Sequence, residues 1–194
     1  MHTHRFRVTG GQKLKGVVQV SGSKNAALPI MAACLLTNEP VTLKNVPDIA
    51  DIYTMQHILH FLGVKANFDG HTLKIHAKAV ADIEIEHELV SKLRGSIVLL
   101  GPLLARNGDV RLAFPGGCVL GKRPVDAHMM ALKALGATVT EEGDVFHLRA
   151  KKLFRPVTLF AGLRCWSQVV NRCVDGPRIF VESNGIELVS AGQF

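Results

Sequence analysis

The chain has 194 residues, of which 47% are hydrophobic and 20% carry a formal charge. This composition is typical of a globular protein and excludes a disordered chain, and the length is enough for one domain or for part of a larger protein. Proline, asparagine or charged residues interrupt every apolar stretch before it reaches the roughly 20 residues of a membrane span. The formal net charge of +7 favours anionic partners such as phosphorylated metabolites, acidic lipid or nucleic acid.

The basic residues are not arranged as in a nucleic-acid-binding protein. They are scattered singly, and with one tryptophan and one tyrosine the chain does not interleave basic and aromatic residues. We therefore expect no nucleic acid and no membrane as partner, and keep a basic nucleic-acid-binding protein only as an alternative. The N-terminal sequence has basic residues but no apolar core, so we predict no signal peptide and a cytosolic location.

The first predicted unit begins with a strand that ends near Val20 and a bend at Ser21, Gly22 and Ser23. An apolar helix, a loop and a strand follow in "AALPIMAACLLTNEPVTLKNVP", and then a helix with acidic residues near its start, which suits the positive end of the helix dipole. The segment "FLGVKANFDGHTLKIHA" predicts the end of that helix and a hairpin that turns at "DG".

The second predicted unit repeats this order. "GSIVLLGPLLARNGDVRLAFP" again predicts helix, loop and strand, Asp126 lies near the start of the next helix, and "ALGATVTEEGDVFHLRA" predicts the hairpin. Gly63 matches Gly136, and Gly70 matches Gly143 at the same offset. We predict a β-α-β-α-β-β unit of roughly 70 residues present twice, with the helices in a common centre and the sheets outside.

From about Lys151 the pattern weakens. A third unit begins, but Arg164, Cys165 and Trp166 stand where an apolar helix is expected, and only "VDGPRIFVES" again predicts a turn and a strand. We therefore expect two full repeats to about residue 150 and an altered or incomplete third repeat over residues 151–194.

The four cysteines are Cys34, Cys118, Cys165 and Cys173. They form no Cys-x-x-Cys pair and no zinc-finger spacing with histidine, so we expect free thiols and no metal site. Cys34 lies within "PIMAACLL" and is predicted to be a buried helix residue.

Two helix starts carry candidate binding residues. In "VSGSKNAALPIM" a bend precedes a helix whose free N–H groups favour an anion, with Lys24 and Asn25 beside them. The alternative is an ordinary serine cap with a solvated lysine. Arg94, in "KLRGSIVLLGP", stands at the start of the corresponding helix, although a lone arginine is more often a surface residue.

The third candidate is "FPGGCVLGKRPVDAH", residues 114–128. Gly116 and Gly117 allow a bend that presents Cys118, and Lys122 and Arg123 are cations of the kind that lower a thiol pKa. Arg123 has the geometry to grip a phosphate or carboxylate, Pro124 suits a first helical turn, and Asp126 and His128 are hydrogen-bonding groups. A structural turn around a buried cysteine is the open alternative.

Taken together, "SGSKNAALPI", "LRGSIVLLGPLLAR" and "PGGCVLGKRPVDAH" resemble the UDP-N-acetylglucosamine enolpyruvyl transferases over residues 6–150. The resemblance implies an inside-out α/β barrel of βαβαββ units, here incomplete. It also implies transfer of the enolpyruvyl group of phosphoenolpyruvate to the 3′-hydroxyl of the sugar nucleotide, with release of phosphate, as the first committed step of peptidoglycan synthesis. Enolpyruvylshikimate phosphate synthase, which shares the fold, lacks the Pro-Gly-Gly-Cys and Arg-Pro-Val-Asp runs and is the second choice.

The same resemblance implies the roles of the site residues. Cys118 is the general acid, forms an adduct with phosphoenolpyruvate and is the thiol that fosfomycin alkylates. Phosphoenolpyruvate is bound by Lys24, Asn25 and Arg123. The sugar nucleotide is bound by Asn25, Arg94, Arg123, Pro124, Val125, Asp126, Ala127 and His128. No cofactor and no metal are implied, and we expect a monomer.

The chain also departs from the family pattern. Family members are about twice as long, and after Lys152 "LFRPVTLFAGLRCWSQ" replaces the expected Lys-Val-Ser-Val-Gly run. The resemblance makes residues 1–21 a segment that packs with a second domain and residues 22–194 the first domain. We expect that second domain to be absent and the chain to have little or no activity alone, so a non-catalytic remnant that binds a nucleotide sugar is the alternative.

Overall fold

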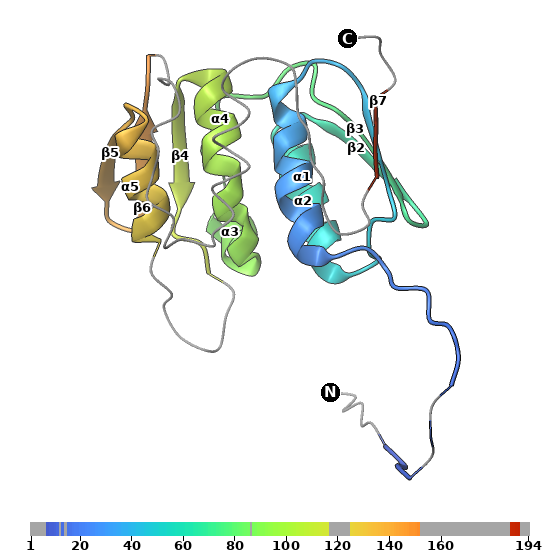
Figure 1. Cartoon of the computed structure of the whole chain (residues 1–194). Helices are drawn as coiled ribbons and strands as arrows, with labels where there is room; N and C mark the ends of the chain where they lie inside the picture. The colour runs from blue at the N-terminus through green and yellow to red at the C-terminus, as the bar shows by residue number, and fades with distance from the viewer. Residues whose placement is uncertain are drawn as a thin grey trace.

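The structure is a computed structural model that describes residues 7–11, 13, 15–85, 87–116, 125–151 and 187–190. Its elements follow the predicted repeat (Figure 1). The first unit contains helix α1 Lys24–Ala33, the 3-10 turn η1 Cys34–Leu36, strand β1 Val41–Lys44, helix α2 Ala50–Phe61, and the hairpin strands β2 Lys65–Asp69 and β3 Thr72–His76. The second contains α3 His87–Lys92, the 3-10 helix η2 Arg94–Leu99, α4 Leu100–Asn107, β4 Asp109–Ala113, α5 Asp126–Ala134, β5 Thr138–Glu142 and β6 Val145–Arg149. Strand β7 is Glu187–Ser190.

Each unit builds its own sheet. The first has the strand order β2-β3-β1-β7 and the second the order β4-β6-β5, and all of these neighbours are antiparallel. The registers correspond, because Leu43 of β1 faces Leu73 in the first sheet and Leu112 of β4 faces Phe146 in the second. The duplication predicted from the sequence is therefore present in the fold.

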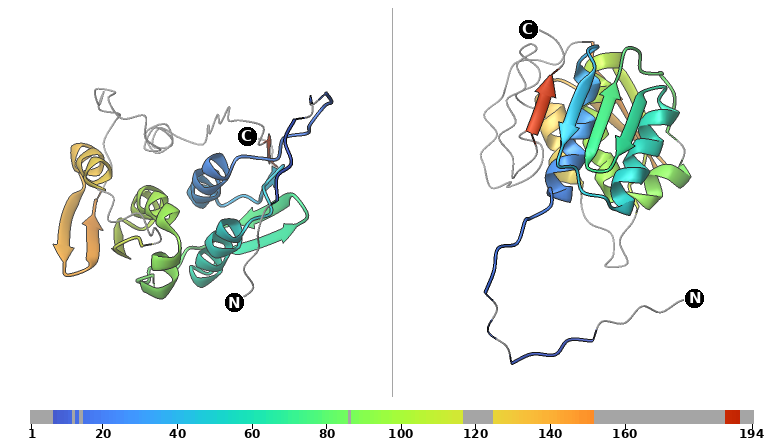
Figure 2. Two further views of the ribbon diagram at one scale, coloured as in Figure 1. Left: turned by 90° about the horizontal axis from the view of Figure 1, so that it is seen from below. Right: turned by 90° about the vertical axis from the view of Figure 1, so that its right-hand side faces the viewer.

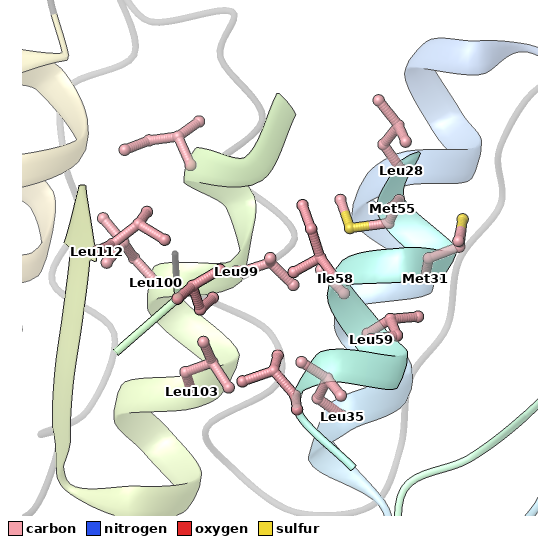
Figure 3. Close-up of a cluster of buried hydrophobic side chains, with 14 of the residues drawn as sticks. Leu28, Met31, Leu35, Met55, Ile58, Leu59, Leu99, Leu100, Leu103 and Leu112 are labelled. Carbon is pink, nitrogen blue, oxygen red and sulfur yellow. The ribbon is translucent and has the colours of Figure 1, made fainter. Parts of the chain in front are cut away.

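Apolar helices fill the space between the sheets (Figure 2, left). Side chains from α1, α2, α4 and β4 point toward one another there (Figure 3), and Met31, Met55, Ile58 and Leu99 have no exposed surface. Helices inside and sheets outside are the arrangement expected for an inside-out α/β barrel, and the barrel is not closed. Among the described residues, no helix has the length and apolarity to span a bilayer.

The four glycines that match between the repeats share a left-handed backbone. Gly63 and Gly136 end helices α2 and α5 with φ of 78° and 98°, and Gly70 and Gly143 turn the two hairpins with φ of 59° and 63°. Other residues adopt such angles only with strain. The spacing of the repeat is thus set by the positions where the backbone requires glycine.

Two expectations need correction. The strand predicted to lead each unit is not formed as a strand in the described residues: residues 15–20 are extended without a partner strand, and the second unit has only a single parallel bridge between Ile85 and Leu112. The helix predicted over "GSIVLLGPLLAR" is divided, since η2 precedes α4. The strand predicted in "VDGPRIFVES" lies outside the described residues, whereas β7 further along pairs with β1.

Arg106 joins the two units. It lies in the last turn of α4, and its Nη1 donates hydrogen bonds to the carbonyl oxygens of Leu35 at 2.6 Å and Thr37 at 3.1 Å. Its Nη2 donates to the carbonyl oxygen of Lys78 at 3.0 Å. The carbonyls of Leu35 and Thr37 lie at the end of η1, and that of Lys78 follows β3. One guanidinium of the second unit therefore satisfies backbone acceptors at two places in the first unit.

Cys34 is buried, as predicted, and begins η1 directly after α1. Burial raises the pKa of its thiol to about 12, with a backbone hydrogen bond acting in the opposite direction. A thiol with this pKa is protonated and unreactive at neutral pH.

Candidate functional site

The starts of α1 and η2 lie side by side and occupy the same place in the two units. When the two repeats are aligned by setting Leu43 of β1 on Leu112 of β4, Asn25 corresponds to Arg94. A Cβ atom added to Gly95 would lie 2.8 Å from Cδ1 of Leu28, so one turn of α1 packs directly on the first turn of η2. Residues predicted from two separate motifs therefore come from adjacent helix starts.

Lys24 begins α1 and makes an ion pair across the first unit. Its Nζ lies 2.7 Å from Oδ2 of Asp51, in the first turn of α2, and the two side chains are 49% and 36% exposed. Ser23 is the N-cap residue, but its side chain makes no capping hydrogen bond. The alternative of a serine cap with a solvated lysine therefore does not describe this helix start. The Ser23 side chain does not cap the helix, and the Asp51 carboxylate holds Lys24.

The bend before α1 is fixed by a close approach of two backbones. A Cβ atom on Gly22 would lie 1.8 Å from the carbonyl oxygen of Asn45, which follows β1 and has φ of 57°. Any side chain at position 22 would therefore clash with backbone, which cannot move as a flexible side chain can. This contact places Lys24 and Asn25 at the carboxyl end of β1.

The second unit also has a close approach of two backbones after its strand β4, but at a different position, since Asn45 aligns with Phe114 and not with Gly116. A Cβ atom on Gly116 would lie 2.5 Å from the carbonyl oxygen of Ser91. In the alignment of the repeats that sets Leu43 on Leu112, Ser91 corresponds to Gly22. The chain that leads from β4 toward Cys118 is therefore anchored beside the segment that leads into η2. Cys118, Lys122, Arg123 and Pro124 themselves lie outside the described residues.

His128 lies in the first turn of α5 and is electrostatically coupled to Arg94. Its pKa is lowered by burial and further by the positive charge of Arg94, while a backbone hydrogen bond with Val125 acts in the opposite direction. The neutral imidazole is therefore favoured beside the guanidinium. Asp126 is exposed at the helix start, Ala127 is half-buried and Val125 is buried as the N-cap residue.

In the structure, Lys24 and Asn25 begin α1 and Arg94 begins the adjacent η2. The charge of Arg94 in turn acts on His128. The sequence predicts acidic residues near the start of this helix, but it does not identify Asp51 as the partner of Lys24. It also missed Ser96, which is fully buried and whose hydroxyl has no hydrogen-bond partner among the described residues. No pattern in the sequence distinguishes that serine.

This arrangement suits an anionic small molecule. Lys24 and Arg94 supply positive charge, and Asn25 supplies an amide that donates and accepts hydrogen bonds. Two helix starts add N–H groups and the positive ends of their dipoles. Electrostatic stabilisation of this kind is the main contribution to catalysis of group transfers that develop negative charge.

Comparisons with known proteins show the family to which the chain belongs. A family model described as EPSP synthase (3-phosphoshikimate 1-carboxyvinyltransferase) matches residues 8–157. The UDP-N-acetylglucosamine 1-carboxyvinyltransferase of Acinetobacter baylyi is 45% identical over 143 residues, covering 74% of this chain and 34% of the relative. The protein of the same name from Pelodictyon phaeoclathratiforme is 48% identical over 136 residues, covering 70% and 32%. The chain spans about a third of the length of these curated relatives.

Solved structures show the same relationship. The enolpyruvyl transferase NikO from Streptomyces tendae superposes with a TM-score of 0.64 at 30% identity, covering 75% of this chain and 32% of that one. An EPSP synthase from Acinetobacter baumannii superposes with a TM-score of 0.54 at 18% identity, covering 73% and 33%, which bears on the fold alone.

Proposed function

Because the chain belongs to the enolpyruvyl transferase family whose model is described as EPSP synthase (3-phosphoshikimate 1-carboxyvinyltransferase), we propose that it supplies part of an active site for enolpyruvyl transfer. The donor is phosphoenolpyruvate, the acceptor is the 3′-hydroxyl of UDP-N-acetylglucosamine, and phosphate is released. The names of relatives at 45% and 48% identity support this acceptor, whereas the EPSP synthase structure at 18% identity supports the fold alone.

The adjacent starts of α1 and η2 carry this proposal. Lys24 and Asn25, with Arg123, bind the phosphate and carboxylate of phosphoenolpyruvate. The sugar nucleotide is bound by Asn25, by Arg94 and Arg123, and by the residues that open α5, namely Pro124, Val125, Asp126, Ala127 and His128. The contact between Leu28 and Gly95 keeps Lys24 and Asn25 on a turn that neighbours the turn of Arg94.

The ion pair of Lys24 with Asp51 fits a binding role. Exposed pairs of this kind contribute about 1 kcal/mol or less, so a phosphate group displaces the Asp51 carboxylate at small cost. Until then Asp51 holds the ammonium group at the helix start. The site is thereby arranged before the substrate arrives, which limits the ordering cost of binding.

Cys118 acts as the general acid. Its thiol transfers a proton to the methylene carbon of phosphoenolpyruvate while the 3′-hydroxyl oxygen of the sugar bonds to the adjacent carbon and that hydroxyl releases its proton to solvent. The resulting tetrahedral intermediate then loses phosphate, and a proton from its methyl group returns to the Cys118 thiolate, which restores the carbon–carbon double bond. Lys24 and Arg123 stabilise the charge that develops on the phosphate.

The wider setting is part of the same proposal. Residues 1–21 form a segment that packs with a second domain, and residues 22–194 form the first domain. The protein is a cytosolic monomer that takes part in peptidoglycan synthesis, and hence in cell-wall formation, cell shape and division. Since the matched part is 34% of a relative's length, we expect little or no turnover from this chain alone.

Selective alkylation of Cys118 tests the proposal without requiring turnover. The chain is incubated with fosfomycin with and without UDP-N-acetylglucosamine, and peptide mass spectrometry follows each cysteine. We expect adduct on Cys118, faster with the sugar nucleotide present, while Cys165 and Cys173 serve as internal controls. Equal modification of the three thiols, or none at Cys118, would contradict the proposal.

A non-catalytic protein that binds the nucleotide sugar is the second candidate, favoured by the 34% coverage of a relative. Phosphate release measured with both substrates, together with the alkylation of Cys118, separates the two. Turnover by this chain would remove the second candidate, whereas saturable binding of the sugar nucleotide without Cys118 alkylation would support it. Binding of 3-phosphoshikimate in preference to the sugar nucleotide would instead indicate an EPSP synthase-like specificity.

A further inference from the structure

Asp51 brings a negative charge to the start of a helix to which it does not belong. Its Oδ2 lies 2.7 Å from Nζ of Lys24 at the start of α1, while Asp51 itself lies in the first turn of α2. The two helices are neighbours in the fold (Figure 2, left). The first turn of α1 contains no acidic residue of its own, so the counter-charge for Lys24 comes from α2.

The repeated framework does not require this carboxylate. When the repeats are aligned on Gly63 and Gly136, Asp51 corresponds to Pro124. The second unit therefore forms its helices and its hairpin without an acidic residue at this position. Lys24 and Asp51 are also partly exposed, at 49% and 36%, and exposed pairs contribute little to stability. Asp51 is thus better explained by the site than by the fold.

The start of α1 has further groups that favour a bound anion. The carbonyl oxygen of Ser23 accepts hydrogen bonds from the N–H groups of Ala26 at 3.1 Å and Ala27 at 2.9 Å. The N–H groups of Lys24 and Asn25 precede these and have no acceptor within the helix. A phosphate bound at this place meets both N–H groups together with the ammonium group of Lys24.

The Asp51 carboxylate and a phosphate compete for the same ammonium group. The ion pair exists in the free protein, so a phosphate that replaces the carboxylate binds more weakly by the free energy of that pair. The displaced carboxylate also stays on the first turn of α2, close to a phosphate dianion that it repels. Because both effects have the same sign, the charge of Asp51 lowers the affinity for phosphate.

We propose that Asp51 is a positioning residue of the anion site, which holds Lys24 in the free protein, gives way to a phosphate group, and returns to promote the release of inorganic phosphate. Phosphate is a product of the proposed transfer, and product release limits the turnover of many enzymes. This role rests on the proposed function only in that Lys24 binds the phosphate, and not on the identity of the acceptor.

Asp51→Asn isolates the effect of the charge, because the amide oxygen of asparagine still accepts a hydrogen bond from an ammonium group. Inorganic phosphate is titrated into the full chain at constant ionic strength, and the chemical shifts of the Lys24 and Asn25 amides report binding. Asp48→Asn is the matched control. It removes an equal charge just before α2, where Asp48 accepts a hydrogen bond from the Tyr53 hydroxyl at 2.8 Å.

We expect Asp51→Asn to tighten phosphate binding at least about threefold, within the roughly fivefold that an exposed ion pair contributes. Dissociation, measured from the line shapes, should slow to a similar extent. Asp48→Asn should change the affinity by less than about 1.5-fold, because a charge without direct contact is screened by salt. Unchanged or weaker binding in Asp51→Asn, or an equal gain in both variants, would overturn this role.

Lys24→Ala separates the role of Asp51 from the proposed function. If phosphate binds equally well without the lysine, the anion site of the proposed function is wrong and the role of Asp51 falls with it. If binding requires Lys24 but is unchanged by Asp51→Asn, only the role of Asp51 is wrong. Asp51→Ser, which also removes the charge and suits a helix start, should show the same gain and replaces Asp51→Asn if that variant does not fold.

Discussion

The two repeats have the same framework but different charged residues at the starts of their helices. In residues 24–76 an exposed pair, Lys24 and Asp51, joins α1 to α2. In residues 94–149 Arg94 acts on half-buried His128, joining η2 to α5. The glycines and the strand registers are common to both units. The shared features make the fold, and the positions where the repeats differ are those proposed to bind ligand.

The largest expected effect concerns the centre that both repeats share. Met55 of α2 is fully buried, whereas Met130 of α5 is 69% exposed. Met55→Ala should lower the free energy of unfolding by about 2–5 kcal/mol because it leaves a cavity, and Met130→Ala should change it by about 0.5 kcal/mol or less. Urea denaturation measures both variants. Equal losses would show that the helices do not form a common core.

The next effect concerns the link between the repeats. Arg106→Ala removes donors to the carbonyl oxygens of Leu35, Thr37 and Lys78, and we expect a loss of about 1–3 kcal/mol in unfolding free energy. Arg106→Lys should recover only part of it, because an ammonium group lacks the planar fork of donors. Thermal unfolding checks this order, and an alanine variant as stable as the wild type would contradict the link.

A pH effect distinguishes the second repeat from the first. The pKa of His128 is lowered in the folded protein by burial and by Arg94, so below about pH 6.5 the unfolded chain binds more protons at this residue. Stability should therefore fall as the pH falls through the lowered pKa. His128→Gln should reduce this fall in urea denaturation at a series of pH values, and profiles that stay parallel to the wild type would contradict it.

The smallest effect on stability concerns the first repeat. Lys24→Ala removes an exposed ion pair and should cost less than about 1 kcal/mol. Lys92→Ala, which removes the exposed pair with Glu88 at 2.7 Å, is the matched control. Both should unfold near the wild-type temperature, yet only Lys24→Ala should weaken binding of phosphoenolpyruvate. A large loss of stability with Lys24→Ala would make the lysine a structural residue.

The duplication, the hairpins and the buried helices could be predicted from the sequence because glycine positions and apolar periodicity are local signals. The absence of the two leading strands could not be predicted from the sequence. Pairing at the edge of a sheet depends on which distant segment reaches that edge, as β7 reaches the edge of β1. The same holds for the pairing of Lys24 with Asp51 and for buried Ser96. The motifs predict Asn25, Arg94 and His128 as site residues, but only the packing of Leu28 on Gly95 shows that two of those motifs are adjacent.

Calorimetric titration of the chain with UDP-N-acetylglucosamine tests most directly whether both repeats contribute to one site. We predict saturable binding that is weakened at least about tenfold by Arg94→Ala, because truncating a buried or partly buried partner of an anion costs about 2 kcal/mol or more. Asn25→Ala in the other repeat should also weaken it, whereas Lys92→Ala should not. Absence of binding heat at millimolar ligand, or equal affinity in all variants, would contradict the account.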